Sequence, residues 1–270
     1  MEPFGTYRPR GRNGLIVTLV RLGFGRGGIK RLWSSLWNRQ GADAPVDVTY
    51  QGLKLRLHPW TNSIESKILL SSKLREEDEL KAIEPYVKGG GSFVDIGANA
   101  GYYSMMAAKM GARRVASVEP NGDLVEKFRA NIAINDFDEI IEVFPVIMGD
   151  TEEVKRLYIA FDLGNSSLIP SDDTENHIDV QQRRLDSVLA ESGIDRISAL
   201  KIDVEGYEDR VLMPFFETAS PDQYPSMMVL EVSSREDWEA DVLDWMLNNG
   251  YELISQTRGN AMLKRAEPAT

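Results

Sequence analysis

One short segment, residues 94–101, constrains the fold of this chain more than any other. It reads Val-Asp-Ile-Gly-Ala-Asn-Ala-Gly, so an apolar strand runs into a turn with two glycines, and a helical pattern follows from Tyr102. Glycine permits the backbone of a tight turn, and the start of a helix presents free amide groups. A strand, a glycine turn and a helix in this order predict an α/β fold whose ligand site lies at the carboxyl end of the strand.

The rest of the chain continues this alternation. We expect strands at residues 93–96, 115–118, 140–148, 199–204 and 227–232, helices at 62–87, 102–110 and 123–135, hairpins over 46–57 and 251–264, and an inserted strand pair at 156–161 and 177–184. Ser234 and Asp237 have the spacing of a capping box and predict the start of another helix. The pattern predicts a Rossmann-like, doubly wound, mostly parallel sheet with helices on both faces.

The expected organisation has three parts. Residues 1–45 form a basic N-terminal arm, residues 46–88 form a hairpin and helical lead-in, and residues 89–270 form the main domain. The arm and the lead-in together make a helical and hairpin extension to the sheet.

Composition excludes several kinds of site. The chain has no cysteine and only two histidines, His58 and His177, which lie far apart. Disulfides, thiolate metal sites and a cysteine nucleophile are therefore excluded, and a metal site is not expected. The absence of cysteine also fits a reducing compartment, so we expect a cytoplasmic protein.

Charge is unevenly distributed along the chain. The net charge is −11, but residues 1–40 hold eight basic residues and one acid, a balance of +7, which leaves −18 for the other 230 residues. An acidic body repels phosphate backbones, so we expect no nucleic-acid partner.

The basic arm also carries apolar residues at helical spacing, among them Leu15, Leu19 and Leu22. Basic residues interrupt this pattern, so we expect neither a secretion signal nor a membrane-spanning helix. We predict that the arm packs on the body, and the alternative is peripheral contact with a membrane face.

The glycine turn is paired with a second carboxylate. Glu119 ends the next strand, 22 residues after Gly97, where a carboxylate accepts hydrogen bonds from ribose hydroxyls. Asn99 and Tyr102 stand where a dinucleotide-binding turn has glycine, and Asp95 would repel a pyrophosphate. S-adenosylmethionine has an ammonium, a sulfonium and a ribose but no phosphate, so we predict this cofactor. Asp95 would then meet its amino-acid end directly or through water, and Glu119 its ribose.

A second acidic segment follows the strand at residues 199–204. Lys201 and Asp203 share one face of that strand, Glu205 follows them, and Glu231 ends the next strand. An alcohol is nearly as weak an acid as water, with a pKa of about 15.7, so transfer to a hydroxyl gains from a general base. Asp203, Glu205 and Glu231 are the candidates for this base. The alternatives are a structural Lys–Asp pair and a carboxylate site for Mg²⁺.

These residues also carry a family resemblance. Residues 93–102, 118–121, 131–135, 184–186 and 201–206 together resemble the FkbM-type methyltransferases, which are class I S-adenosylmethionine-dependent enzymes. The resemblance covers residues 46–235, including Asn165 to Leu168, and leaves residues 1–40 unmatched. It implies a seven-stranded sheet with an antiparallel last strand, and methyl transfer to a hydroxyl of a polyketide, a sugar or another small molecule.

The resemblance also assigns residues. The expected cofactor-binding residues are Asp95, Gly97, Ala98, Asn99, Gly101, Tyr102, Glu119, Pro120, Asn121 and Asp203. Asp203, Glu205 and Gly206 match the segment after the family's fourth strand. Two other functions stay open from the residues alone, a non-catalytic cofactor-binding or scaffold protein and an NAD(P)-dependent oxidoreductase.

The acceptor is not identified by the sequence. We expect its specificity to come from the arm and from residues 57–75, 161–182 and 206–224. Six aromatic residues are candidates either for an apolar pocket or for the core: Tyr102, Tyr103, Phe161, Tyr207, Phe215 and Phe216. The oligomeric state is not predicted.

Overall fold

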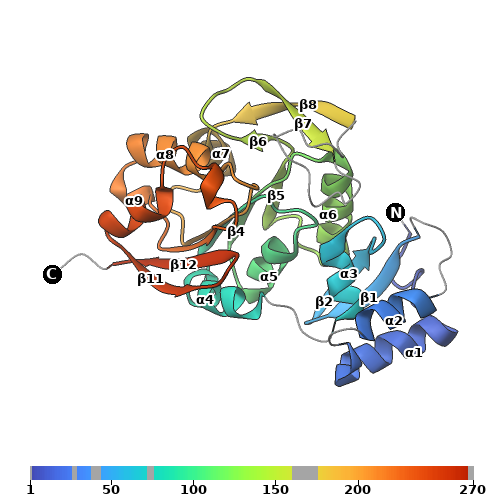
Figure 1. Ribbon diagram of the computed structural model, residues 1–270. Coiled ribbons are helices and arrows are strands. Elements are labelled where there is room, and N and C mark those ends of the chain that lie inside the picture. Colours follow the sequence, from blue (N-terminus) through green and yellow to red (C-terminus); the bar gives the residue numbers. More distant parts are fainter. Residues whose placement is uncertain (1, 26–28, 38–43, 72–75, 160–175, 267–270) are drawn as a thin grey trace.

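The computed structural model describes residues 2–25, 29–37, 44–71, 76–159 and 176–266, and within them seven strands form a central sheet (Figure 1). Its spatial order is β11 (Tyr251–Gln256), β12 (Asn260–Arg265), β10 (Met227–Glu231), β9 (Ala199–Ile202), β3 (Ser92–Ile96), β4 (Arg114–Val118) and β5 (Ile141–Phe144). Neighbouring strands from β10 to β5 pair in parallel, whereas β12 is antiparallel to both of its neighbours. This order confirms the expected doubly wound sheet with an antiparallel last strand.

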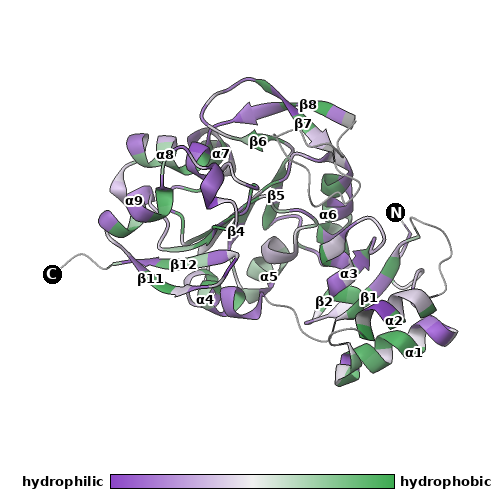
Figure 2. Ribbon diagram, in the orientation of Figure 1, coloured by the Kyte–Doolittle hydropathy of each residue, from purple (hydrophilic) through white to green (hydrophobic). Residues whose placement is uncertain are grey.

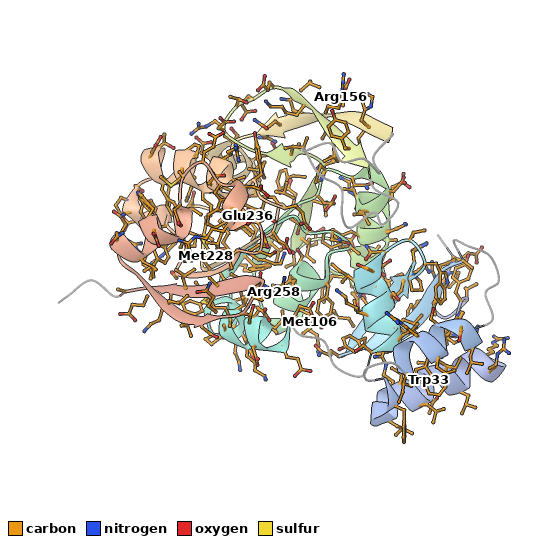
Figure 3. The ribbon with its side chains drawn as sticks, in the orientation of Figure 1. Trp33, Met106, Arg156, Met228, Glu236 and Arg258 are labelled. Carbon is orange, nitrogen blue, oxygen red and sulfur yellow. The ribbon has the colours of Figure 1, made fainter. Side chains whose placement is uncertain are left out.

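Helices cover both faces of the sheet. One face packs against α4 (Glu77–Val87), α5 (Tyr102–Met110) and α6 (Gly122–Ile134), and the other against α7 (Leu185–Ser192), α8 (Glu208–Thr218) and α9 (Val242–Asn248). Adjacent residues of β3 serve different faces, since Phe93 joins the first core cluster and Val94 the second. Because both faces are buried, the strands read as continuous apolar runs. Figure 2 shows this hydropathy pattern, and Figure 3 shows the side chains that fill the layers.

A smaller sheet lies beyond β5. It contains β6 (Ile147–Met148), β8 (Asn176–Arg183) and β7 (Val154–Ile159), in this order. The single strand expected at 140–148 is therefore wrong, because it is split at Pro145, whose nitrogen has no hydrogen to donate to a sheet. The inserted strand pair is confirmed for the described residues, whereas residues 160–175, including Phe161 and Asn165 to Leu168, lie outside them.

The N-terminal part packs on the sheet domain. It comprises α1 (Gly11–Leu19), the π-helical turn η1 (Val20–Phe24), α2 (Ile29–Leu36), the hairpin of β1 (Val46–Tyr50) and β2 (Leu53–Leu57), and α3 (Ser63–Leu70). Ile16, Val20 and the hairpin leucines share one hydrophobic core cluster with Phe93 of the central sheet. The expected packing of the arm is thus confirmed, while the helix expected at 62–87 is two helices, α3 and α4.

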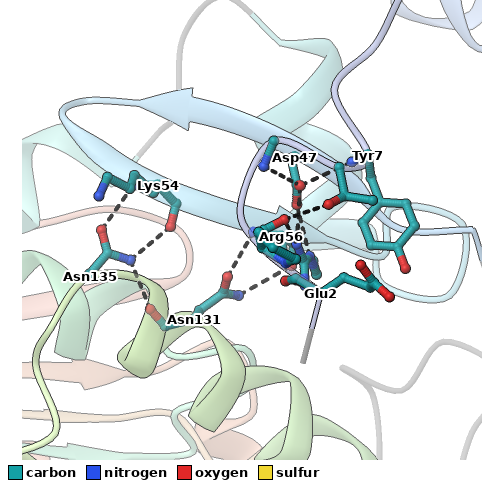
Figure 4. Close-up of polar contacts among 10 residues, drawn as sticks. Glu2, Tyr7, Asp47, Lys54, Arg56, Asn131 and Asn135 are labelled. Atoms are coloured by element: carbon teal, nitrogen blue, oxygen red, sulfur yellow. Dashed lines mark hydrogen bonds and ion pairs between the residues drawn. The ribbon is translucent and has the colours of Figure 1, made fainter.

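Two asparagines attach the hairpin to α6 (Figure 4). The Asn131 amide accepts a hydrogen bond from the Arg56 amide (2.7 Å) and donates one to the Arg56 carbonyl (3.2 Å). Asn135 exchanges the same pair of hydrogen bonds with Lys54, at 2.9 and 2.7 Å. Each asparagine therefore pairs with the hairpin backbone as a neighbouring strand would.

Two short 3₁₀ turns, η3 (Pro221–Gln223) and η4 (Arg235–Asp237), flank β10. The helix start expected at Ser234 is wrong: its side chain makes no capping hydrogen bond, and α9 begins only after Asp241, which accepts from the Asp244 amide (3.1 Å). Over the described part of the chain, no helix has the length and apolar character needed to span a bilayer.

Candidate functional site

The glycine turn joins β3 to α5 through left-handed backbone. Gly97 and Gly101 have φ of 78° and 79°, and Asn99 has φ of 53°. A Cβ on Gly97 would lie 1.9 Å from the Asp203 carbonyl oxygen, and one on Gly101 would lie 2.0 Å from the Phe128 ring. Both glycines therefore make room for the chain itself, with β9 passing Gly97 and α6 passing Gly101.

Glu119 is held against this turn by backbone amides. One carboxylate oxygen accepts from the Asn99 amide (2.8 Å) and the other from the Asn121 amide (2.9 Å). The side chain is buried, and desolvation raises its pKa to about 7 although the two amides oppose the shift. A carboxylate has about four acceptor positions, so two remain for a ligand.

Asn99 links the turn to the lead-in. Its side-chain oxygen accepts from its neighbour Ala100 (2.7 Å) and from the Asn62 amide group (2.6 Å). Asn62 also caps α3 by accepting from the Ile64 and Glu65 amides. The start of α3 is thereby held over the glycine turn.

A pocket of about 310 Å³ opens at the carboxyl ends of β3, β4 and β9. Of the expected cofactor-binding residues, the pocket wall includes Gly97, Ala98, Asn99, Tyr102, Glu119, Pro120 and Asp203. Its volume and mixed polar and apolar lining are typical of small-molecule sites. Five carboxylates, from Glu65, Glu76, Glu119, Asp203 and Glu205, face two ammonium groups, from Lys67 and Lys201. The site is therefore acidic.

Asp95 and Asn121 lie behind this wall. Asp95 is fully buried, and one of its oxygens accepts from the Ser104 amide (3.1 Å) and hydroxyl (2.5 Å). Desolvation raises the pKa of Asp95, against the opposing charge of Lys201. The Asn121 side chain caps α6 by accepting from the Asp123 amide (3.0 Å). Gly101 also lies outside the wall, under the Phe128 ring.

The charged pair on β9 is an ion pair at the pocket. Lys201 lies 3.2 Å from Asp203, and its ammonium is 5.1 Å from the centre of the Tyr103 ring. Burial alone would lower the pKa of Lys201, but Asp203 and Asp95 together outweigh it, so its pKa lies above the ordinary value. The pair is thus both a structural feature of the strand and part of the pocket wall.

The other two acidic candidates differ in position. Glu205 lies at the pocket with a left-handed φ of 55°, and desolvation followed by the charge of Asp203 raises its pKa. Glu231 is buried outside the pocket wall, where one oxygen accepts from the Ser233 amide (2.6 Å) and hydroxyl. Desolvation raises the pKa of Glu231 to about 8, with the charge of Glu208 adding to the shift. Geometry therefore separates Glu231 from Asp203 and Glu205.

Some aromatic candidates line the pocket and others pack in the core. Tyr102, Tyr103 and Tyr207 contribute to the pocket wall, although the Tyr102 hydroxyl donates outward to Gln51 in the hairpin turn (3.0 Å). Phe215 and Phe216 pack in the second core cluster. The core interpretation is thus correct for this last pair.

Sequence reasoning expected residues 57–75 to contribute to specificity, but it named no residue of α3. Glu65 lies in the wall and is fully buried, with one oxygen accepting from the His58 amide (2.9 Å) and the other without a hydrogen-bond partner among the described residues. Desolvation raises its pKa to about 7. The sequence carries only a weak signal, because Glu65 stands beside Ser66 and Lys67 in a segment whose polar residues also fit an exposed helix face.

Throughout the described ranges, no group of three or more histidine, aspartate or glutamate side chains is arranged to hold a metal ion.

Comparison with known proteins identifies the class. The sheet order with one antiparallel strand and a pocket after β3 and β4 is the class I methyltransferase fold. The profile of the methyltransferase FkbM domain matches residues 95–253, which are 159 of the 270 residues. The chain belongs to the FkbM methyltransferase family. This membership places the chain in a methyltransferase family and disfavours the NAD(P)-dependent oxidoreductase alternative, while the non-catalytic alternative stays a prediction.

Individual relatives are more distant. A ribosomal protein L11 methyltransferase of Syntrophomonas wolfei is 39% identical over 64 residues, 24% of this chain and 21% of that protein. One of Caldicellulosiruptor saccharolyticus is 26% identical over 159 residues, 59% of this chain and 45% of that protein. The chain thus spans between a fifth and a half of the length of these relatives.

Solved methyltransferase structures superpose on this chain only in part. Methyltransferase FkbM of Methylobacillus flagellatus KT superposes with a TM-score of 0.46 at 20% identity, covering 65% of this chain and 43% of that one. The ribosomal protein L11 methylase of Lactobacillus delbrueckii superposes with a TM-score of 0.43 at 11% identity, covering 86% and 91%.

Proposed function

We propose that this methyltransferase uses S-adenosylmethionine and methylates a hydroxyl group on a small molecule, a sugar or a polyketide-type acceptor. The observation that carries the proposal is the acidic pocket, in which Glu119 is held ready by two backbone amides beside the glycine turn. An excess of carboxylates favours a cofactor with positive charge and no phosphate.

The residues present fit this cofactor. Glu119 has two acceptor positions left for the ribose hydroxyls, and Ala98, Asn99 and Pro120 would surround it. Glu65 has a buried oxygen at the same wall that no described residue hydrogen-bonds, which suits a polar or cationic group. S-adenosylmethionine would supply a methyl group already activated by the sulfonium.

We propose an indirect role for Asp95. Its burial behind the wall and its two hydrogen bonds from Ser104 favour action through positioning rather than direct contact. Because Ser104 lies in the first turn of α5, the carboxylate holds the start of this helix against β3. The charge of Asp95 also supports the ammonium of Lys201.

Glu205 is the best placed candidate for the general base. Its raised pKa brings it closer to neutral pH, where proton acceptance is most effective. Asp203 forms an ion pair with Lys201, so we propose that the two side chains together orient a ligand. The position of Glu231 outside the wall favours Asp203 and Glu205 over Glu231 as residues that touch the acceptor.

Two observations favour a small hydroxyl compound as the acceptor over a nucleic acid or a protein. The body carries −18 outside residues 1–40, which disfavours a nucleic acid. The relatives named for ribosomal protein L11 share only part of their length with this chain, so a protein acceptor has less support.

The test is transfer of labelled methyl from S-adenosylmethionine to a panel of hydroxyl compounds, with ribosomal protein and RNA as parallel acceptors. We expect transfer to a hydroxyl compound, unaffected by EDTA. Transfer only to protein or RNA would contradict the proposed acceptor, and loss with EDTA followed by rescue with Mg²⁺ would contradict the metal-free base.

Glu205→Gln should lower kcat with little change in cofactor affinity, whereas the reverse pattern would make Glu205 a cofactor ligand.

A further inference from the structure

The arm exposes a second apolar stripe in addition to the one that it buries. Six of the eleven large hydrophobic residues exposed in the described part of the chain fall between residues 15 and 36: Leu15, Leu22, Phe24, Ile29, Leu32 and Leu36. Leu15 and Leu22 are 60% and 70% exposed. A surface helix of a soluble domain normally turns one apolar stripe to the core and polar residues to water, so this second stripe needs an occupant.

The exposed stripes follow helical spacing on both arm helices. On α1 and η1, Leu15 and Leu22 lie seven residues apart, and on α2, Ile29, Leu32 and Leu36 lie three and four apart. The buried residues Ile16 and Val20 take another side of α1 and η1, and Trp37, directly after α2, is also buried. Because the buried sides face the body, the exposed sides face away from it.

The arm helices form one unit. The Trp33 indole on α2 donates a hydrogen bond to the Phe24 carbonyl at the end of η1 (2.5 Å). Figure 3 shows Trp33 at one end of the molecule, well apart from Met228 on β10. The exposed stripes of α1, η1 and α2 thus belong to one terminal surface, here called the arm surface.

The segment that carries the arm surface has only basic charges in its sequence. Residues 3–42 contain eight lysines and arginines and no acid, and the other 230 residues carry −19. Arg8, Arg10, Arg12 and Arg31 are exposed, and none of them forms an ion pair with another described residue. The molecule is therefore strongly polarised between this arm and an acidic body.

The first residues of the arm are fastened to the hairpin. The Asp47 carboxylate accepts from the amides of Gly5 (2.8 Å) and Tyr7 (3.1 Å) and pairs with Arg56 (2.9 Å). Arg56 also donates to the carbonyls of Glu2 and Pro3 (Figure 4). Contacts of the arm surface would consequently orient the whole enzyme.

We propose that the arm surface docks on an anionic lipid membrane. Leucine, isoleucine and phenylalanine side chains would enter the region between headgroups and acyl chains, and the arginines would meet lipid phosphates. The same membrane would repel the acidic body, so the body would lie on the side of the arm that faces away from the lipid. Exposed leucine, isoleucine and phenylalanine side chains next to arginines are the combination that binds an anionic membrane surface, which favours a lipid occupant.

The test is flotation of the full-length protein with vesicles of phosphatidylcholine alone, or of equal parts phosphatidylcholine and phosphatidylglycerol. We expect binding to the anionic vesicles only, weakened by salt. Leu15→Ser combined with Leu22→Ser should lower the bound fraction by about tenfold or more, because two exposed leucines lose their insertion. The matched control is Leu253→Ser with Ile254→Ser, two exposed residues of β11, which should leave binding unchanged.

A charge pair of variants completes the design. Arg10→Glu with Arg12→Glu should abolish the preference for anionic vesicles. Lys81→Glu on α4 with Lys88→Glu at the end of this helix, which makes the same change of net charge, should preserve it. Cofactor binding by calorimetry should be the same in all variants, which separates this inference from the proposed function. Absence of lipid-dependent binding, or wild-type binding by both arm variants, would overturn the proposal. Self-association that depends on Leu15 and Leu22 without vesicle binding would assign the arm surface to a second copy of the chain.

Discussion

At the scale of single residues, the site is governed by carboxylates that the fold removes from water. Glu65 and Glu119 both lie in the pocket wall, and burial raises the pKa of each to about 7. Near neutral pH each group is therefore shared between its two protonation states. A positively charged ligand would stabilise the ionised state, which links ligand binding to pH.

Glu119→Ala should weaken S-adenosylmethionine binding by about 1.5–3 kcal/mol, or roughly tenfold to over a hundredfold, because hydrogen bonds to a charged acceptor are lost. Calorimetry measures this directly. Glu231→Ala is the matched control, since Glu231 is also a buried strand-end carboxylate but lies outside the pocket wall. Equal losses in both variants would mean that the effect is general destabilisation.

The same carboxylate should make cofactor affinity depend on pH. Because the pKa of Glu119 is about 7, its ionised form increases as pH rises from about 6 to about 8, and affinity for a cationic cofactor should rise over this interval. In Glu119→Gln this rise should be reduced. A flat profile in the wild-type protein would argue that Glu119 is already ionised or does not meet the cofactor.

Glu65→Gln should stabilise the protein at about pH 8 by about 1–3 kcal/mol and leave its stability almost unchanged below about pH 4. The folded pKa of about 7 exceeds the ordinary value of 4.5. Between pH 4.5 and 7, Glu65 is protonated in the folded state but ionised in the unfolded state, so the stability of the fold decreases as pH rises. Above about pH 7 the whole free-energy cost of ionising the buried Glu65 is present. Denaturant unfolding at the two pH values tests this, with Glu217→Gln on the exposed side of α8 as control. Equal effects of Glu65→Gln at both pH values would show that the charge of Glu65 is not the cause.

At the scale of elements, local order predicted the parts that lie close in sequence. The strand, glycine turn and helix at residues 92–110 were predictable because the strand, the turn and the helix start are neighbours in the chain. The break at Pro145 was visible in the sequence but outweighed by the apolar pattern around it. The hydrogen bond between Asn62 and Asn99 was not predictable, because it joins residues 37 positions apart and depends on how α3 folds over the turn.

The glycine turn should tolerate little change. Gly97→Ala and Gly101→Ala should each destabilise the fold by about 2 kcal/mol or more, because both positions have left-handed backbone and a Cβ would overlap Asp203 or Phe128. Thermal unfolding measures the loss. Gly122→Ala at the start of α6 is the matched control, since nothing lies within 4 Å of its added Cβ, and it should be neutral or stabilising. Wild-type stability of Gly101→Ala would refute the packing explanation.

At the scale of the whole molecule, the extension and the sheet domain share one core. The expected boundaries after residues 45 and 88 fall between elements, but Ile16, Leu55 and Phe93 belong to the same hydrophobic cluster. Asn131 and Asn135, which the sequence offered only as part of a family resemblance, have a defined structural role in holding the hairpin to α6. This role depends on contacts more than seventy residues apart, which no local pattern records.

Asn131→Ala should therefore cost about 1–3 kcal/mol of stability, since it leaves the buried backbone amide and carbonyl of Arg56 without partners. Asn135→Ala should cost less, because Lys54 is exposed and water replaces the lost hydrogen bonds. Chemical denaturation compares the two variants. A larger loss of stability in Asn135→Ala than in Asn131→Ala would mean that burial does not determine how much these hydrogen bonds contribute.

The central claim is that the acidic pocket of this FkbM-family methyltransferase binds S-adenosylmethionine. Isothermal calorimetry of the purified protein with S-adenosylmethionine and S-adenosylhomocysteine, with NADH as control, tests it most directly. We predict binding of the first two and none of NADH. Binding of NADH, or binding of none of the three by folded protein, would contradict the account and leave the glycine turn as a feature of the fold alone.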